Sequence, residues 1–219
     1  MKKILITGAN RGIGLELSRQ LVDRGDEVIA VCRTSSKQLD DLNLRVIEGI
    51  DVSDDDSLKG LRTQTGGGGL DWLINNAGIL SVESLDSLDF KAMERQFRVN
   101  ALGPLRVTRA LLPVLGEGSK VGIITSRMGS IEDNTSGGYY GYRMSKAAVN
   151  MAGMSLARDL GERRIAVALL HPGMVATDMT GGRGIRPSQS ASGLIDRMDA
   201  LDMAGTGSFW HAEGERLPW

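Results

Sequence analysis

Short apolar runs alternate with helical patterns along the whole of this 219-residue chain. The apolar runs predict strands over residues 3–7, 27–32, 44–50, 70–75, 120–125, 165–170 and 207–211. Apolar residues at helical spacing predict helices over 13–24, 90–115, 142–160 and 190–201, and Ser53, followed by three aspartates, predicts one more helix start. Strands that alternate with helices form a parallel sheet covered on both faces, because the crossovers are right-handed. We therefore predict a doubly wound α/β fold in three layers, which binds ligands beyond the carboxyl ends of its strands.

Length and composition indicate a single domain. No break in composition marks a boundary, so we expect one domain over residues 1–219. One cysteine, Cys32, excludes an internal disulfide framework, and with only two histidines a zinc site is not expected. The net charge of −1 and a pI near 6.2 give no electrostatic signature for nucleic acid or an anionic membrane. The first residues do not resemble a signal peptide and no run reaches the length of a membrane span, so we expect a cytoplasmic protein.

A glycine-rich turn, Thr7-Gly8-Ala9-Asn10-Arg11-Gly12-Ile13-Gly14, joins the first predicted strand to the first predicted helix. Gly8 permits a tight turn, Gly12 lets the backbone approach a pyrophosphate, and Gly14 allows close packing of the helix on the strand. The phosphates would then meet free N–H groups at the start of a helix. A glycine cluster alone is often only a turn, but this strand–turn–helix context favours dinucleotide binding.

The end of the second predicted strand indicates which dinucleotide the chain binds. An NAD site usually places an acid there to bind the ribose 2′-hydroxyl, but the residues after Val31 are Cys32, Arg33 and Thr34. Arg33, together with Arg11, could instead bind a 2′-phosphate, for which guanidinium groups are suited. The alternative is that both arginines are solvated surface charges. We expect NADP(H) rather than NAD(H), and we interpret Cys32 as a packing residue.

Tyr142 and Lys146 lie four residues apart, and on a helix they share one face. A nearby cation stabilises phenolate, so we expect the pKa of the tyrosine to fall from its usual value of about 10. Such a tyrosine could exchange a proton with a substrate oxygen near neutral pH. Alone, the pair would more often be a solvated helix face, and it gains weight from the glycine-rich turn.

Polar and small residues follow three further predicted strands. Asp51, followed by Val52, could contact an adenine or simply cap a turn or helix. Asn75-Asn76-Ala77-Gly78 suits a tight loop that lets a cofactor pass, or a plain turn. Ser126 could donate a hydrogen bond to a substrate carbonyl, although a loop serine alone means little.

Two more segments contain candidate functional residues. Asn100 is a poor helix-interior residue, so we expect it to bond backbone groups and kink its helix, or to hold a water. After the sixth predicted strand, Pro172-Gly173 forces a turn that could send the following residues across the cofactor site, where Thr177 could bond a carboxamide. We interpret His171, at the end of that strand, as a structural residue rather than a base.

In their order and spacing these motifs resemble the short-chain dehydrogenase/reductase family, from Thr7 to about Met179. The resemblance implies a Rossmann-type fold with a catalytic tetrad of Asn100, Ser126, Tyr142 and Lys146. The dinucleotide contacts that it implies are Gly8, Asn10, Arg11, Gly12, Ile13, Gly14, Arg33, Asp51, Val52, Asn76, Ala77, Gly78, Tyr142, Lys146, Pro172, Gly173, Val175 and Thr177. Within the family the chain looks most like the small carbonyl reductases of the sniffer and C-factor type, on residues 133–140 and the terminal Leu217-Pro218-Trp219.

The separation of Ser126 and Tyr142, sixteen positions, is a few residues longer than is usual in the family. We expect the extra residues in the glycine-rich loop before Tyr142, and they leave Ser130 as the alternative to Ser126. The assignment of the tyrosine does not change, because only Tyr142 of the three tyrosines has a lysine four residues on.

The resemblance implies NADPH-dependent reduction of an aldehyde, ketone or quinone to an alcohol. In that reaction Ser126 polarises the carbonyl and Tyr142 donates the proton. Lys146 holds the nicotinamide ribose, and Asn100 holds a water that resupplies the proton. The alternative that the resemblance allows is an NAD(P)-binding signalling or regulatory protein of C-factor type. An isomerase of the extended branch, which shares the Tyr/Lys pair, is disfavoured by the short chain and by the three-residue gap within the glycine-rich turn.

The substrate, a small carbonyl compound or alcohol, would enter an apolar pocket. Candidate lining residues are Met128, Met174, Met179, Tyr139 and Trp210, although core packing is the commoner use of methionine. Glycines at 181, 182 and 184 predict a flap over the site, within a small substrate-capping segment at about 180–204.

By family resemblance we also expect a homodimer or homotetramer. The helices predicted over 90–115 and 142–160 could pair across a two-fold axis. The small residues of the second helix that would allow close approach are Ala147, Ala148, Ala152 and Gly153.

Overall fold

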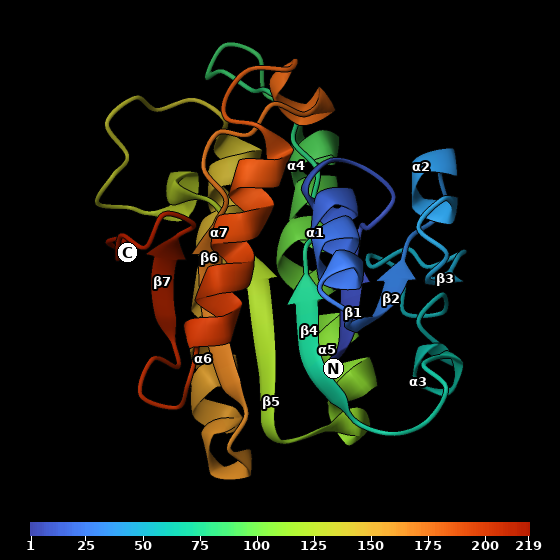
Figure 1. Ribbon diagram of the computed structural model, residues 1–219. Coiled ribbons are helices and arrows are strands. Elements are labelled where there is room, and N and C mark those ends of the chain that lie inside the picture. The colour runs from blue at the N-terminus through green and yellow to red at the C-terminus, as the bar shows by residue number, and fades with distance from the viewer.

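Seven strands form one parallel sheet, and the structure, a computed structural model, describes all 219 residues (Figure 1). The strands are β1 (Lys3–Thr7), β2 (Glu27–Val31), β3 (Arg45–Ile47), β4 (Leu70–Asn75), β5 (Leu115–Ile124), β6 (Ala166–His171) and β7 (Ser208–His211). Their order in the sheet is β3-β2-β1-β4-β5-β6-β7, and every neighbouring pair is parallel. The order reverses between β1 and β4, where a doubly wound sheet opens a crevice at its carboxyl edge. The predicted fold is confirmed.

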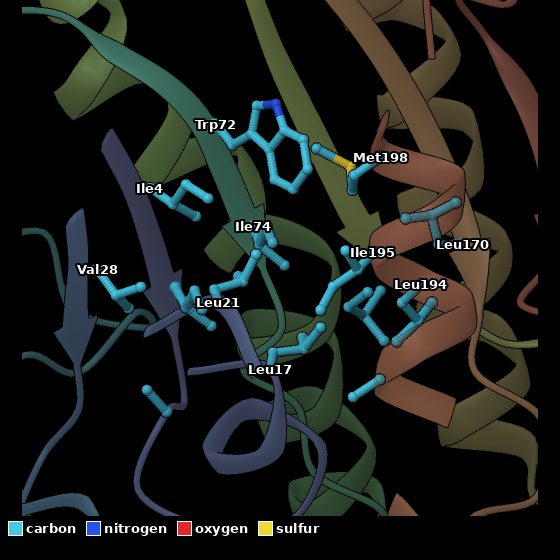
Figure 2. Packing of buried hydrophobic residues seen from close by; sticks show 14 of the residues in the cluster. Ile4, Leu17, Leu21, Val28, Trp72, Ile74, Leu170, Leu194, Ile195 and Met198 are labelled. Atoms are coloured by element: carbon cyan, nitrogen blue, oxygen red, sulfur yellow. The ribbon is translucent and has the colours of Figure 1, made fainter. Parts of the chain in front are cut away.

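Helices cover both faces of the sheet, because alternate side chains of each strand point to opposite faces. Ile4 and Ile6 of β1 join a cluster with Leu17 of α1 (Gly12–Asp23) and Leu194 of α7 (Pro187–Ala200). Figure 2 shows this cluster, with the side chains of α1 and α7 facing one another. Leu5 of β1 points the other way, into a second cluster against α5 (Gly103–Leu111) and α6 (Tyr140–Asp159). Each cluster holds 21 buried residues, so both faces of the sheet are closed by a full core.

The helix predicted over residues 90–115 is not one continuous α-helix. It consists of α4 (Phe90–Gln96), a π-helical stretch η1 (Phe97–Leu102), α5 and a 3₁₀ turn η2 (Leu112–Val114). Pro104 has no N–H, so it cannot donate to the carbonyl of Asn100, as the residue at that position of an α-helix would. The helix widens to a π-helix just before this proline, and such widening is frequent at functional sites.

The helix predicted to start at Ser53 is wrong. Residues 52–60 form turns, and the only helix in this region is α3 (Leu61–Gln64), which follows Gly60 with a φ of 81°. The Asp51 carboxylate accepts hydrogen bonds from both the N–H and the hydroxyl of Ser53, at 2.8 and 2.7 Å. Short polar side chains that bond the nearby backbone compete with helix formation, and here they replace it with turns.

Other predicted boundaries shift by a few residues. β3 is shorter than predicted, β5 begins at Leu115 rather than at residue 120, and the short helix α2 (Lys37–Asp40) was not predicted. The remaining single turns are the 3₁₀ helices η3 (Arg127–Gly129), η4 (Gly161–Arg163) and η5 (Asp178–Thr180). None of the helices is both long and apolar enough to span a membrane.

Candidate active site

The predicted site residues gather at the carboxyl edge of the sheet, at the top of Figure 1. Six groups follow the ends of strands, and three residues come from helices. Residues 8–14 follow β1, Arg33 follows β2, Asp51 and Val52 follow β3, 76–78 follow β4, Ser126 follows β5 and 172–177 follow β6, while Asn100 lies in η1 and Tyr142 and Lys146 lie in α6. The fold therefore brings together residues that are far apart in the sequence.

The glycine-rich turn has the backbone and the close approaches that its glycines predicted. Gly8 and Gly12 have positive φ angles of 66° and 56°, which side chains rarely adopt. A Cβ at Gly8 would lie 2.9 Å from the Cα of Ala77, and one at Gly12 would lie 3.3 Å from the Cγ2 of Thr177. A Cβ at Gly14 would collide with the carbonyl of Gly8. The turn thus leads into α1 with its backbone uncovered, a geometry that fits a pyrophosphate at the helix start.

Hydrogen bonds from the end of β4 hold the turn in place. The Asn76 amide donates to the carbonyls of Thr7 and Gly8, at 3.0 and 3.1 Å. The Thr7 hydroxyl in turn accepts from the N–H groups of Asn76 and Ala77, both at 3.1 Å. Thr7 was not predicted as a site residue; the sequence reasoning gave it only as the end of a strand and the first residue of the glycine-rich turn.

The two arginines expected near the adenosine ribose differ in their surroundings. Arg11 forms an ion pair with Asp178 at 3.2 Å, and both side chains are exposed. Arg33 is exposed at the end of β2. Partial burial alone would raise the pKa of the Asp51 carboxyl. Hydrogen bonds from Ser53 and the charge of Arg33 outweigh this effect and hold the pKa below its usual value. Arg33 is therefore the arginine without a bound acid, and it lies close enough to Asp51 to affect its titration.

Other residues expected at the adenosine end have mainly structural contacts. The Asn10 amide donates to the Thr34 carbonyl at 2.9 Å and so ties the glycine-rich turn to the end of β2. The side chain of Val52 belongs to the second core cluster, beside Gly103. Ile13 packs against the first cluster. The buried Val52 has mainly its backbone left to offer a cofactor, whereas Ile13 is half-buried.

Tyr142, Lys146 and Ser126 form a buried group beside the glycine-rich turn. Their exposed fractions are 8%, 4% and 7%, so none is the solvated helix face that the Tyr/Lys spacing alone would suggest. The Ser126 hydroxyl lies close enough to the Tyr142 hydroxyl to lower its pKa. The Lys146 ammonium donates to the Ile124 carbonyl at 2.9 Å and lies 5.6 Å from the centre of the Tyr142 ring.

Burial changes the ionisation of this pair, and for the tyrosine the change is opposite to the prediction. Removal from water raises the pKa of the Tyr142 hydroxyl to about 12, and the nearby Ser126 hydroxyl offsets only part of the rise. Burial also lowers the pKa of Lys146 to about 8. The prediction of a lowered tyrosine pKa is therefore wrong, because desolvation by burial dominates the shift.

Of the two candidate serines, Ser126 and not Ser130 contacts the tyrosine. The Ser126 hydroxyl accepts from the Met128 N–H at 3.1 Å and lies close enough to Tyr142 to affect its ionisation. The Ser130 hydroxyl accepts from the N–H of Asp133 at 3.0 Å and caps the turn that starts the longer loop. The geometry therefore favours Ser126.

The Asn100 side chain is fully occupied by protein partners. Its carbonyl accepts from the Ile79 N–H at 2.8 Å, and its amide donates to the Ile79 carbonyl at 2.9 Å and to the Ser145 hydroxyl at 3.0 Å. Asn100 therefore fixes the segment after β4 against α6 and lies in a π-helical stretch, as the predicted backbone bonding and helix distortion require. If it holds a water, the acceptor is its main-chain carbonyl, which Pro104 leaves without an α-helical donor.

The turn after β6 faces the glycine-rich turn. Gly173 has a φ of 83°, and the Pro172 carbonyl accepts from the Ser190 hydroxyl of α7 at 2.7 Å. Ser190 was another residue that the sequence reasoning missed. Burial, followed by the charges of His211, Arg127 and Lys146, lowers the pKa of His171 to about 3, so His171 is a very weak base, consistent with the structural interpretation.

A flap follows this turn over residues 174–186. Val175 and Ile185 are bridged, with the Ala176 N–H donating to the Ile185 carbonyl at 2.9 Å, and Gly181, Gly182 and Gly184 all have positive φ. The rest of the predicted capping segment is different. Residues 187–200 form α7, which packs on α1 in the first core cluster, so only the residues before Pro187 are placed to cap a site.

The expected pocket residues divide into two groups. Met174 and Met179 are 55% and 44% exposed on the flap, Met128 is half-buried after Ser126, and Tyr139 is exposed at the start of α6. Trp210 packs against the first core cluster instead, so core packing is its main role. No cluster of three or more His, Cys, Asp or Glu side chains could hold a metal ion.

The chain is similar to known proteins over its whole length. A family model described as short chain dehydrogenase matches residues 2–186. A 1-hydroxy-2-glutathionyl-2-methyl-3-butene dehydrogenase of Rhodococcus sp. (strain AD45) is 45% identical over 226 residues, covering all of both chains. The C-signal protein of Myxococcus xanthus is 46% identical over 156 residues, which cover 69% of this chain and 94% of that one.

Solved structures of carbonyl reductases have the same fold. The NADPH-bound carbonyl reductase from chicken fatty liver matches with a TM-score of 0.92 and 31% identity, over 100% of this chain and 99% of that one. The carbonyl reductase Sniffer of D. melanogaster matches with a TM-score of 0.91 and 32% identity, over all of both chains.

Proposed function

The chain belongs to the short-chain dehydrogenase/reductase family of oxidoreductases, on the sniffer and C-factor side that its motifs predicted, and we propose that it uses NADPH to reduce a small carbonyl compound to an alcohol. The observation that carries the proposal is the buried group of Ser126, Tyr142 and Lys146 beside the glycine-rich turn. A protein that only bound a dinucleotide would have no use for a buried phenol beside a serine hydroxyl.

The site can donate a proton to a carbonyl oxygen. With a pKa raised to about 12, the Tyr142 hydroxyl is protonated at neutral pH and is a proton donor. The Ser126 hydroxyl lies beside it and polarises the same carbonyl oxygen with a second hydrogen bond. When bound, the reduced nicotinamide supplies the hydride that the carbonyl carbon accepts. The proton that Tyr142 gives to the oxygen completes the alcohol, and the tyrosinate left behind is stabilised by the charge of Lys146.

Lys146 and Asn100 provide the route by which Tyr142 regains its proton. A Cβ placed at Gly78 would lie 3.4 Å from the Asn100 side-chain carbonyl and 3.8 Å from the Lys146 ammonium, so the bare backbone of Gly78 leaves room beside both residues. In this proposal Lys146 binds the ribose hydroxyls of the cofactor. A water on the main-chain carbonyl of Asn100 links the ammonium to solvent.

The cofactor cradle consists of the contacts predicted from the sequence, with the backbone of residues 8–14 around the phosphates and residues 76–78 and 172–177 around the nicotinamide half. The preference for NADPH rests on Arg33, which forms no ion pair, and on the absence of an acid at the end of β2. Arg11 would have to leave Asp178 to reach a 2′-phosphate. The NADPH in the chicken carbonyl reductase supports the same preference.

Two relatives support narrower alternatives. The Rhodococcus dehydrogenase, identical at 45% of positions over the full length, favours a hydroxy compound that carries a glutathionyl group as the substrate class, with the reaction running as an oxidation. The C-signal protein favours a signalling role for which turnover is not needed. The second alternative leaves the buried proton donor without a use.

The test is a substrate panel followed by the absorbance of the reduced nicotinamide. Aldehydes, ketones, quinones and diketones are offered with NADPH and with NADH, and glutathionyl alcohols are offered with NADP⁺ and NAD⁺. Turnover of carbonyls with a preference for NADPH supports the proposal. Turnover of the glutathionyl alcohols alone favours the first alternative. Cofactor binding, seen as a raised melting temperature, without any turnover favours signalling.

A further inference from the structure

Glu83 is a buried carboxylate that the proposed reaction does not use. It lies in the segment between β4 and α4 and is 3% exposed, while its neighbours Val82 and Leu85 are 70% and 72% exposed. An ionised carboxylate in such a place costs free energy unless its oxygens are hydrogen-bonded. Its partners therefore show what the carboxylate is for.

Every group that contacts the Glu83 carboxylate donates a hydrogen bond. One oxygen accepts from the Ser81 hydroxyl at 2.6 Å and from the Gln96 amide at 2.8 Å. The other accepts from the N–H of Gly141 at 3.2 Å. A set made only of donors suits an ionised carboxylate, which accepts at both oxygens and donates at neither.

These partners lie at the two elements that hold the catalytic groups. Gly141 is the second residue of α6 and directly precedes Tyr142, and the preceding cap residue, Tyr139, makes no side-chain cap. Glu83 supplies that cap from a distant part of the chain, and its main-chain carbonyl also accepts from the Tyr139 N–H at 2.9 Å. A negative charge at a helix start is favourable because the helix dipole is positive there.

The other partner, Gln96, ends α4 and precedes the π-helical stretch that contains Asn100. Its own side-chain carbonyl accepts from the Ser81 N–H at 3.1 Å, so its orientation is fixed from both sides. The packing between the two helices is tight, since a Cβ at Gly141 would lie 2.8 Å from the Cγ of Met93. One carboxylate thus ties the segment after β4, the end of α4 and the start of α6.

We propose that Glu83 is a positioning residue: its carboxylate sets the first turn of α6 and so holds the Tyr142 hydroxyl in line with Ser126. The inference rests on the proposed function, because what is positioned is the proton donor of that reaction. Small displacements of a reacting group are costly, and about 1 Å can lower a rate by about a hundredfold.

The donor pattern gives a sharp test, because glutamine cannot replace Glu83. In Glu83→Gln the new amide nitrogen, itself a donor, faces either the Gly141 N–H or the Gln96 amide. Two hydrogen-bond donors then face each other without an acceptor. The double variant Glu83→Gln/Gln96→Glu restores a partner for each group, since the new carboxylate at 96 accepts from the amide at 83 and from the Ser81 N–H. Glu94→Gln, on an exposed residue of α4, is the matched control for loss of one carboxylate.

The experiment measures kcat, KM and the Kd for NADPH of these variants. We expect Glu83→Gln to lower kcat by at least about tenfold, while the Kd for NADPH stays within about twofold of the wild-type value. The double variant should recover most of kcat. Glu94→Gln should match wild type. An unchanged kcat in Glu83→Gln, or a loss that the double variant does not recover, would overturn the proposal. Where Glu83→Gln does not fold, Glu83→Asp, which keeps the charge but cannot reach Gly141, takes its place with the same expected loss of kcat.

A second measurement separates this inference from the proposed function. Amide hydrogen exchange at Gly141 needs no turnover, and we expect it to be at least about tenfold faster in Glu83→Gln and restored in the double variant. If wild type reduces no carbonyl, the proposed function fails, and the exchange result still decides the role of Glu83. An unchanged exchange rate at Gly141 would show that Glu83 does not hold the start of α6.

Discussion

At the scale of single residues, burial decides how Tyr142 and Lys146 act as acids. The pKa of the tyrosine is raised to about 12 and that of the lysine is lowered to about 8, so the two values approach each other from opposite sides. At neutral pH both groups hold their protons, the state from which Tyr142 can donate. Above pH 8 the lysine is the first of the two to lose its proton.

This order predicts the pH dependence of the reaction. We expect kcat for carbonyl reduction to fall as the pH rises through about 8, because neutral Lys146 no longer stabilises the tyrosinate that proton transfer creates. The measurement is kcat against pH with saturating NADPH and substrate. In Lys146→Arg, whose guanidinium stays charged, the residual rate should not show this decline. A wild-type profile that stays flat well above pH 8 would contradict the role of the lysine.

Arg33 predicts the cofactor preference. Arg33→Ala should raise the Kd for NADPH by at least about tenfold, since a hydrogen bond to a charged phosphate contributes about 1.5–3 kcal/mol. The Kd for NADH, which has no 2′-phosphate, should not change. Arg158→Ala, on an exposed position of α6, serves as the control. Equal weakening of both cofactors by Arg33→Ala would show that the arginine does not read the phosphate.

The residues named from the sequence are those whose type and local spacing have a recognisable chemistry, such as the glycines after β1 and the Tyr142/Lys146 pair. The residues that were missed make their contacts with partners far along the chain. Thr7 accepts from Ala77, 70 positions away, and Glu83 caps a helix 58 positions away. No local pattern reports such a partner. Ionisation could not be predicted for the same reason, because it depends on burial by distant segments.

At the scale of elements, the π-helical stretch η1 connects the segment after β4 to α6, the helix that contains Tyr142 and Lys146. Its Asn100 bonds the backbone of Ile79 on one side and Ser145 of α6 on the other. Pro104 leaves the carbonyl of this residue without its α-helical donor. The distortion of the helix is thus what allows one asparagine to serve two neighbours and still present an acceptor.

Asn100→Ala should therefore affect both stability and rate. The change leaves the N–H and the carbonyl of Ile79 without partners, and we expect the free energy of unfolding to fall by about 3 kcal/mol. We also expect kcat to fall at least about tenfold. Chemical denaturation and steady-state kinetics measure the two effects, with Lys91→Ala on exposed α4 as the control, expected within about 0.5 kcal/mol. Wild-type stability in Asn100→Ala would contradict the bracing role.

The boundaries of helices and strands were predictable where the spacing of apolar residues decides them. They were not predictable where side-chain hydrogen bonds to the backbone compete with the helix. The apolar spacing over residues 90–115 correctly indicated helical structure, but the π-helical widening follows from a single proline and one buried asparagine. The turns after Asp51 arise because its carboxylate accepts hydrogen bonds from Ser53. The run of aspartates in the sequence does not by itself distinguish such a turn from the start of a helix.

At the scale of the whole molecule, an apolar surface remains on the side of α4 and α6. Phe90 and Phe97 are 66% and 40% exposed, and Met144 and Met151 are 58% and 69% exposed. Each pair is seven residues apart, so each lies on one helix face. Gly153 packs against Leu169 and Ala148 packs against the second core cluster, so these two small residues face the sheet and are not available for contact between copies.

We predict that this surface pairs with itself in a homodimer, because exposed apolar patches commonly mark interfaces. Light scattering at micromolar concentration should give twice the mass of the chain. Met151→Glu, which places a charge on this surface, should give a monomer that keeps its fold by circular dichroism. A wild-type monomer, or a dimer that Met151→Glu does not disturb, would contradict this interface.

The overall architecture followed from the sequence because alternating strands and helices allow few other arrangements. The assignment of residues 180–204 to a cap shows the limit of that reasoning. The glycines correctly marked a loop before Pro187, but the apolar face of α7 was needed to complete the first core cluster, and only the assembled sheet reveals that need.

The central claim is that Tyr142 donates the proton in an NADPH-dependent carbonyl reduction. The most direct measurement is the single-turnover rate of Tyr142→Phe with bound NADPH and the best carbonyl of the panel, alongside the Kd for NADPH. We predict a rate at least about two orders of magnitude below wild type with an unchanged Kd, because the variant keeps the ring and loses the hydroxyl that donates the proton. A rate near that of wild type would contradict the account.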